Sequence, residues 1–136
     1  SDAGAHNSLL CDAAYGMHLL SHWVRERSVF DLPTAIRKLT SDPADVYGLV
    51  DRGRLTPGAH ADMMLFDPDT LSVSKLERHF DLPAGGERMM RRAPGLTSTW
   101  VNGVRVFDGT DYLQHAHGPG QVITTFSADQ PRLGMR

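Results

Sequence analysis

Residues 48–67 read GLVDRGRLTPGAHADMMLFD and join a helical first third of the chain to a second half of strands and turns. Gly53 and Gly58 favour turns, and Pro57 fixes the φ angle immediately before Gly58. Four apolar residues, Met63–Phe66, follow these turns. A short apolar run bounded by turn signals predicts a strand buried on both faces. The stretch therefore predicts that the chain leaves a helical layer here and enters a small β domain.

A first helix is predicted upstream of this stretch, over residues 12–27. Its apolar residues recur at the spacing of one helix face: Met17, Leu20 and Val24. His18 and His22 lie four residues apart, so both side chains could face one metal ion. The local sequence offers no third ligand, and a pair of surface or core-edge histidines is the stronger interpretation.

Two shorter helices are predicted next. The second helix begins at residue 31 or 32, with Pro33 in its first turn, where the missing N–H of proline costs nothing. The third helix begins at Asp42-Pro43, with Asp42 as its N-terminal cap, and ends at Gly48. The predicted buried face of the second helix consists of Leu32, Ile36 and Leu39.

The second half of the chain contains one clear β-hairpin. Two β-rich runs, residues 99–101 and 104–107, flank Asn102-Gly103. Both turn residues tolerate the positive φ angles that a type I′ turn requires. The hairpin is therefore the clearest element of secondary structure that the sequence predicts.

The remaining segments give weaker signals. Residues 71–96 are predicted to be irregular, with a turn over residues 81–86 and a helical turn over residues 87–92. That helical turn carries a basic cluster, interpreted as a solvated face in preference to an anion or subunit contact: Arg88, Arg91 and Arg92. A last strand is predicted over residues 122–126, and a poorly ordered tail over residues 127–136.

The composition excludes several classes of function. The chain of 136 residues carries 14 Lys and Arg against 16 Asp and Glu, a net charge of −2, so it lacks the basic surface of a nucleic-acid-binding protein. No apolar run reaches the ~18 residues of a membrane helix. The single cysteine, Cys11, excludes an internal disulfide and predicts a reducing compartment, the cytoplasm.

The glycine, proline and aspartate spacing of residues 48–67 resembles the amidohydrolase superfamily, although a generic tight loop before a strand is the alternative. The matching positions are Gly48-Leu49, Asp51-Arg52-Gly53, Leu55, Pro57-Gly58, Ala61-Asp62 and Asp67. In that superfamily such a pattern marks the passage from a metal-dependent (β/α)8 barrel to a small β-sandwich. A whole barrel needs roughly 200 residues or more, so the chain is expected to be the C-terminal end of a larger enzyme.

The resemblance implies an α/β fold in three parts. Residues 1–55 are expected to form the last loop and helices of the barrel. Residues 56–126 are expected to form part of the β-sandwich, and residues 127–136 a flexible tail. The Asn102-Gly103 hairpin agrees with this assignment, because the terminal sandwich of the family commonly carries one.

The resemblance also implies one catalytic residue. Asp2 matches the aspartate at the end of the eighth barrel strand, which in the family binds the catalytic metal and transfers a proton between the attacking water and the leaving nitrogen. His6 is a weaker candidate, as a neighbour of the metal ligands or a substrate contact. Judged without the resemblance, an aspartate near a terminus is usually a solvated loop residue.

Within the superfamily the chain resembles the N-acyl-D-amino-acid deacylases. Three segments carry the likeness: residues 1–6, residues 49–67, and residues 81–85 with the following Arg-bearing turn and hairpin. The resemblance implies hydrolysis of a small amide with one or two zinc ions, most of whose ligands lie upstream. The chain departs from the group at residues 3–7, Ala-Gly-Ala-His-Asn, where D-aminoacylases carry a Pro- and Arg-containing loop that helps to hold the substrate carboxylate. This departure leaves the substrate open.

Two other interpretations stay open at this point. The chain could be a non-catalytic helix-plus-β interaction or scaffold module. It could also bind metal through four histidines, if the first helix and a C-terminal loop meet: His18, His22, His115 and His117. If it is instead an enzyme fragment, its helices lack the sheet that they normally cover, so we expect self-association or contact with an upstream polypeptide. Alone, such a fragment is expected to be inactive, since one carboxylate cannot hold a hydrolytic zinc.

Overall fold

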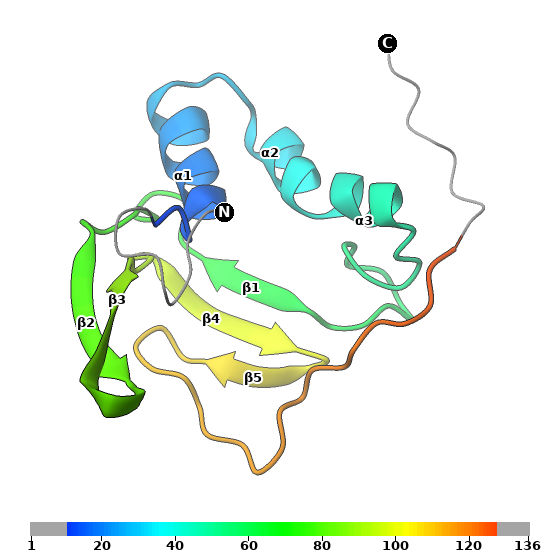
Figure 1. The fold of residues 1–136 in the computed structure, drawn as a ribbon. Helices are drawn as coiled ribbons and strands as arrows, with labels where there is room; N and C mark the ends of the chain where they lie inside the picture. The colour runs from blue at the N-terminus through cyan, green and yellow to red at the C-terminus, as the bar shows by residue number, and fades with distance from the viewer. Residues whose placement is uncertain (1–10, 128–136) are drawn as a thin grey trace. The chain divides into compact units, whose positions relative to one another are not determined.

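The computed structural model describes residues 11–127, which fall into two compact units (Figure 1). Unit 1 combines the residues up to 31 with residues 67–95, and unit 2 combines residues 32–66 with the residues from 96 onward. Each unit therefore takes residues from both sides of the expected boundary at residue 55. The expected barrel and sandwich parts concern a longer protein and stay a prediction.

Unit 2 contains a three-stranded antiparallel sheet. Its strands are β1 (Met63–Phe66), β4 (Leu96–Val101) and β5 (Val104–Phe107), and β4 lies between the other two (Figure 1). Asn102 and Gly103 have φ angles of 48° and 78°, so the predicted positive-φ turn is confirmed. The predicted strand at β1 is also confirmed, and it pairs with β4 although about 30 residues separate the two in sequence.

The prediction that β1 is buried on both faces is wrong. Met63, Met64 and Leu65 keep 36%, 39% and 57% of their surface exposed. β1 is an edge strand of a small sheet, so only one of its sides has a hydrogen-bonded neighbour among residues 11–127. An apolar run shows that a segment is hydrophobic, but it does not show whether neighbouring elements bury it.

Two helices complete the regular structure of unit 2, α2 (Leu32–Leu39) and α3 (Ser41–Tyr47). The predicted start of α2 and the end of α3 at Gly48 are confirmed, and Gly48 adopts the left-handed conformation with φ of 70°. The predicted cap of α3 is wrong. Thr40 precedes the helix and its hydroxyl donates back to the Ile36 carbonyl at 2.7 Å, while Asp42 lies inside the first turn.

The first helix, in unit 1, is shorter and less regular than predicted. It begins as α1 (Tyr15–His18) and continues as η1 (Leu19–Glu26), a π-helix with its hydrogen bonds one residue longer than in an α-helix. Two consecutive residues of η1, Leu20 and Ser21, are buried, and the Ser21 hydroxyl donates to the Met17 carbonyl at 2.8 Å. Sequence periodicity at 3.6 residues could not reveal this geometry.

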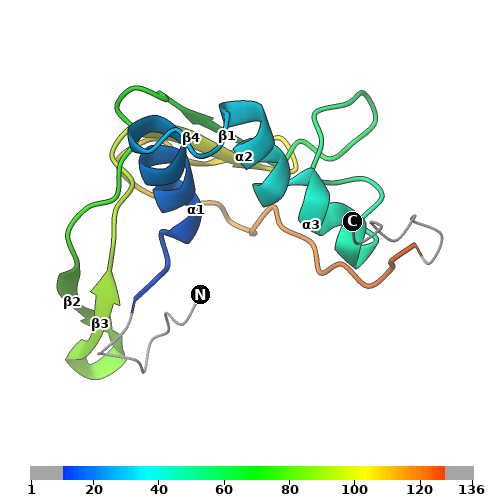
Figure 2. The same cartoon turned by 90° about the horizontal axis from the view of Figure 1, so that it is seen from above.

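Unit 1 also contains a hairpin where irregular structure and a helical turn were predicted. The strands β2 (Glu77–Leu82) and β3 (Gly86–Met90) run side by side in both views, joined by the 3₁₀ turn η2 (Pro83–Gly85) (Figure 1, Figure 2). These strands carry many charged residues and no apolar alternation. Two ion pairs, Arg78–Glu87 and Arg88–Asp81, link them. The predicted turn is confirmed, and the helical turn over residues 87–92 is wrong.

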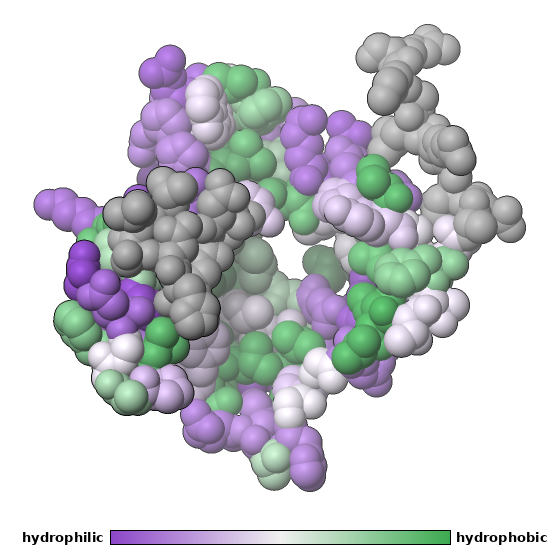
Figure 3. Space-filling view, viewed as in Figure 1, coloured by the Kyte–Doolittle hydropathy of each residue, from purple (hydrophilic) through white to green (hydrophobic). Residues whose placement is uncertain are grey.

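The hydrophobic core is small. Among residues 11–127, five apolar residues are buried, divided between the units: Cys11, Leu20 and Leu71 in unit 1, and Ala35 and Ala44 in unit 2. Leu71, 1% exposed, is the largest side chain that is fully buried among the described residues. Apolar residues consequently reach the surface in several places between polar ones (Figure 3).

Residues 121–127 follow the sheet without forming a strand, so the predicted last strand over residues 122–126 is wrong. Val122 keeps 89% of its surface exposed and Phe126 keeps 54%, so neither apolar side chain is buried by a neighbouring strand. Within the part of the chain that the structure describes, no helix is long and apolar enough to cross a membrane.

Candidate functional site

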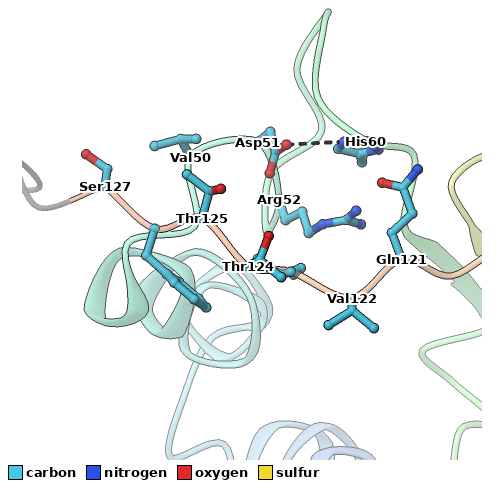
Figure 4. A pocket seen from close by; sticks show the side chains of 11 residues that line it. Val50, Asp51, Arg52, His60, Gln121, Val122, Thr124, Thr125 and Ser127 are labelled. Carbon is cyan, nitrogen blue, oxygen red and sulfur yellow. Dashed lines mark ion pairs between the residues drawn. The ribbon is translucent and has the colours of Figure 1, made fainter.

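The two residues that the sequence predicts for catalysis, Asp2 and His6, lie outside the described residues. The structure therefore bears on the site only through residues 11–127. Within them, a pocket of about 420 Å³ lies in unit 2, beside the stretch from which the fold was predicted. Its lining comes from two segments, residues 50–60 and residues 121–127 (Figure 4).

An ion pair occupies one wall of this pocket. The Nε2 atom of His60 lies 3.2 Å from Oδ2 of Asp51, and the two side chains are 33% and 50% exposed (Figure 4). The backbone reinforces the approach, because the His60 N–H donates to the Asp51 carbonyl at 2.9 Å. This second bond closes the Gly- and Pro-containing loop at its base, so the loop sequence positions both side chains.

Arg52 has a different environment from this pair. Its side chain is only 12% exposed, and its Nη1 atom donates both to Oδ2 of Asp62 and, at 3.3 Å, to Oδ1 of Asn102. The Asp62 carboxylate also accepts the backbone N–H of Asn102 at 2.7 Å. We call these three residues the Arg52–Asp62–Asn102 cluster. The cluster joins the loop before β1 to the turn between β4 and β5.

The opposite wall is held at both of its ends. Nδ2 of Asn102 donates to the Pro119 carbonyl at 2.6 Å, and the Ser127 N–H donates to the Gly48 carbonyl at 2.9 Å. Between these anchors the segment presents the hydroxyl groups of Thr124 and Thr125 to the pocket. The pocket thus offers neutral hydrogen-bonding groups on one wall and a carboxylate–imidazole pair on the other.

The structure does not bring the paired histidines of the first helix together with a third potential metal ligand among the described residues. The rings of His18 and His22 stack with centroids 4.9 Å apart and planes 14° from parallel. Nδ1 of His22 lies 2.8 Å from Oε2 of Glu26, and this hydrogen bond is the main reason that the pKa of Glu26 is below its ordinary value of 4.5. Parallel stacking and a carboxylate partner agree with the interpretation of a surface or core-edge pair.

The C-terminal histidines are arranged no more favourably for metal binding. Nε2 of His115 lies 2.8 Å from the Arg105 carbonyl, which makes that nitrogen a donor and removes it as a metal ligand. Residues 11–127 contain no group of three or more His, Cys, Asp or Glu side chains that could hold a metal ion. The described residues therefore do not fit a zinc centre.

Two of the arginines in the basic cluster bind within unit 1. Arg88 donates two hydrogen bonds of 2.6 Å to the Asp81 carboxylate across the hairpin. Arg91 donates to the Cys11 carbonyl at 3.1 Å and to the Ser74 carbonyl at 3.0 Å. The Arg88 bonds link the two strands of the hairpin, and the Arg91 bonds join the residue after β3 to Cys11 and Ser74.

Comparison with known proteins shows the family. The family model described as the amidohydrolase family matches residues 5–107, more than half of the chain. The chain belongs to the amidohydrolase family. This membership confirms the resemblance on which the sequence analysis relied, and the D-aminoacylase-like structural neighbours agree with an α/β fold of this family.

Three enzymes of Alcaligenes xylosoxydans are among the similar curated amidohydrolases. An N-acyl-D-aspartate deacylase is 38% identical over 106 residues, covering 78% of this chain and 19% of the relative. An N-acyl-D-glutamate deacylase is 35% identical over 105 residues, covering 77% and 19%. A D-aminoacylase is 34% identical over 111 residues, covering 81% and 20%. The chain thus spans about a fifth of the length of the curated relatives it matches.

Solved structures of deacylases of this family also align with the chain. A D-aminoacylase crystal structure aligns with a TM-score of 0.57 and 31% identity, over 74% of this chain and 19% of that chain. An N-acyl-D-glutamate deacylase from Bordetella bronchiseptica, complexed with zinc and a phosphonate inhibitor, aligns with a TM-score of 0.52 and 35% identity, over 68% and 19%.

The sequence did not predict the pocket, although four of its eleven lining residues lie within residues 48–67. Asp51 and His60 are visible there as a carboxylate and an imidazole nine residues apart. Their pairing depends on the closure of the intervening loop, which spacing alone does not establish. The other wall was predicted to be a strand, and a strand there gave no indication of a pocket.

Proposed function

We propose that this chain is the C-terminal portion of a zinc-dependent amidohydrolase that cleaves the amide C–N bond of an N-acyl-D-amino acid. The observation that carries the proposal is the 38% identity with an N-acyl-D-aspartate deacylase over 78% of the chain. The zinc in the structure of the related N-acyl-D-glutamate deacylase supports the choice of metal. A location in the cytoplasm belongs to the same proposal and rests on the single cysteine.

The proposal includes the finer assignment of the fold. Residues 1–55 would supply the last loop and helices of a (β/α)8 barrel, and residues 56–126 part of a β-sandwich. In support, α2 and α3 precede the loop at Gly48, and the three-stranded sheet follows it. In this assignment the Arg52–Asp62–Asn102 cluster holds the loop against the sheet and takes no part in the catalytic reaction.

Asp2 is the one catalytic and metal-binding residue that we propose within this chain, and His6 is a candidate neighbour of the metal or substrate. A single carboxylate cannot hold a hydrolytic zinc, which needs about three protein ligands. The remaining ligands would come from upstream parts of the same enzyme, in agreement with the fifth of the relatives' length that the chain spans.

The test is amide hydrolysis by the whole protein that contains this chain. N-acetyl-D-aspartate, N-acetyl-D-glutamate and a neutral N-acetyl-D-amino acid are supplied separately, with the L-isomers as controls. We expect release of a free D-amino acid from at least one, loss of the rate after treatment with a chelator, and recovery with added zinc. A folded, zinc-supplied protein that cleaves none of the D-substrates would contradict the proposal and favour a non-catalytic interaction module.

A further inference from the structure

The Asn102-Gly103 pair, besides forming the turn, has a sequence that is prone to deamidation. In an Asn-Gly sequence the backbone nitrogen of glycine can attack the asparagine side-chain carbonyl carbon, since glycine has no Cβ to hinder it. The new N–Cγ bond closes a succinimide ring, and the Cγ–Nδ2 bond breaks to release ammonia. Water then opens the ring and leaves aspartate or isoaspartate. The reaction needs no cofactor.

The structure engages every group that takes part in this reaction. The attacking nitrogen, the Gly103 N–H, donates to the Ala61 carbonyl at 2.9 Å. The leaving nitrogen, Nδ2 of Asn102, donates to the Pro119 carbonyl at 2.6 Å. Oδ1 of Asn102 accepts from Arg52 at 3.3 Å. The Asn102 N–H is held by Asp62 at 2.7 Å.

These four contacts come from three separate segments of unit 2: the loop of residues 52–62, the turn itself, and residue 119. Attack by the Gly103 nitrogen requires rotation of the Asn102 side chain and loss of the bond to the Ala61 carbonyl. Each of the surrounding hydrogen bonds opposes that rearrangement. The rate of the reaction should therefore report how firmly the three segments are held together.

The product of the reaction could not form the same contacts with Pro119 and Asp62. The side chain of an aspartate at position 102 has no N–H to donate, so it cannot bind the Pro119 carbonyl. Its carboxylate would also lie beside that of Asp62, and like charges at short range disfavour each other. Arg52, which contacts both side chains, would have to compensate for two negative charges. Residues 119–127 would lose the anchor that holds them beside the turn.

We propose that Asn102 is a deamidation site that the Arg52–Asp62–Asn102 cluster protects, and that its conversion releases residues 119–127 from the turn. The closed cluster keeps the asparagine intact. Opening of the cluster exposes the reactive pair, and conversion then prevents the cluster from closing again. The segment that forms one wall of the pocket would permanently lose its anchor at the turn, and its hydrogen bond to the Gly48 carbonyl would no longer be supported from the other end.

The first experiment measures the rate of conversion in the whole protein at neutral pH and 37 °C, by the mass gain of the Asn102 peptide and by ammonia release. A synthetic peptide of residues 99–106 gives the unprotected rate. We expect at least a tenfold slower conversion in the folded protein than in the peptide, and a several-fold increase with Asp62→Ala. Asp45→Ala is the matched control, because it breaks another ion pair of unit 2, with Arg54, that does not touch Asn102. Equal rates in protein and peptide would overturn the protection.

The second experiment keeps the proposal testable if Asp62→Ala fails to fold. Asn102→Asp imitates the product directly, and aspartate tolerates the φ angle of 48° at this position. Hydrogen exchange of the Ser127 N–H, which is bound to the Gly48 carbonyl, reports release of the segment. We expect at least tenfold faster exchange in Asn102→Asp, with little change at the amides that pair β1 with β4. Unchanged protection at Ser127 would overturn the proposed release.

Discussion

At the scale of single residues, the backbone of unit 1 has a position where only glycine fits. Gly95 has a φ of 88°, and a Cβ there would lie 2.5 Å from the Leu71 nitrogen and 2.6 Å from its Cα. Leu71 is the main buried side chain of this unit, so neither partner can move freely. We expect Gly95→Ala to lower the free energy of unfolding by about 2–4 kcal/mol, from backbone strain together with overpacking. Urea denaturation followed by circular dichroism measures the change.

Gly85→Ala is the control for this prediction within the same unit. Gly85 also has a positive φ, 70°, but a Cβ there would meet nothing within 4 Å. Its substitution should cost only the conformational strain, about 1–2 kcal/mol. If the two substitutions destabilise the protein equally, close contact with Leu71 is not what requires glycine at residue 95.

At the scale of secondary-structure elements, the β2–β3 hairpin depends on ion pairs. The two hydrogen bonds from Arg88 hold the pKa of the Asp81 carboxyl below its ordinary value of 3.8. A carboxyl with a lower pKa in the folded state stabilises the fold above its unfolded pKa, and that contribution is lost as the pH falls through the folded pKa. We expect the hairpin to loosen only below about pH 4. An NMR titration of the Asp81 carboxyl measures the pKa, which should rise toward 3.8 in Arg88→Gln.

Arg78→Gln provides the comparison on the same hairpin, because Arg78 pairs with Glu87 and not with Asp81. The Asp81 pKa should stay low in that variant. A rise of similar size in both variants would mean that the general positive charge of the hairpin, and not the hydrogen bonds from Arg88, sets the pKa.

The elements also show what the sequence could predict. Asn102-Gly103 required a tight turn and Pro33 a helix start, because each restricts its own backbone, and the structure has both. The β2–β3 hairpin was missed because its strands carry charged residues that pair across the hairpin, a stabilisation that hydrophobic patterning does not detect. The π-helix was missed because the spacing of apolar residues does not reveal a hydrogen-bond pattern that differs from that of an α-helix. The sequence predicted the elements that local backbone restrictions determine, and it did not predict those that depend on pairing between distant residues.

At the scale of the whole molecule, the same distinction applies to the site. Asp2 could be nominated only because a family motif supplied its role, and it lies outside the described residues. The Asp51–His60 pair lies within them, but its approach depends on loop closure, and its pocket depends on a segment some 60 residues further along the chain. A site assembled from distant segments is not encoded in any one of them.

The proposed division of the chemistry between this chain and the rest of the enzyme predicts where zinc is lost by mutation. In the whole protein we expect Asp2→Asn to reduce kcat by about 10²–10⁴-fold, the usual size of a lost acid–base group, and to lower the zinc content measured by elemental analysis. The double variants His18→Ala/His22→Ala and His115→Ala/His117→Ala should keep the zinc content and kcat of the parent. The reason is that neither pair belongs to a group of three or more potential metal ligands among residues 11–127, and that the rings of His18 and His22 stack on each other. If instead the zinc content falls with either histidine pair and not with Asp2→Asn, the metal is held by this chain's own histidines, and the assignment of Asp2 has to be abandoned.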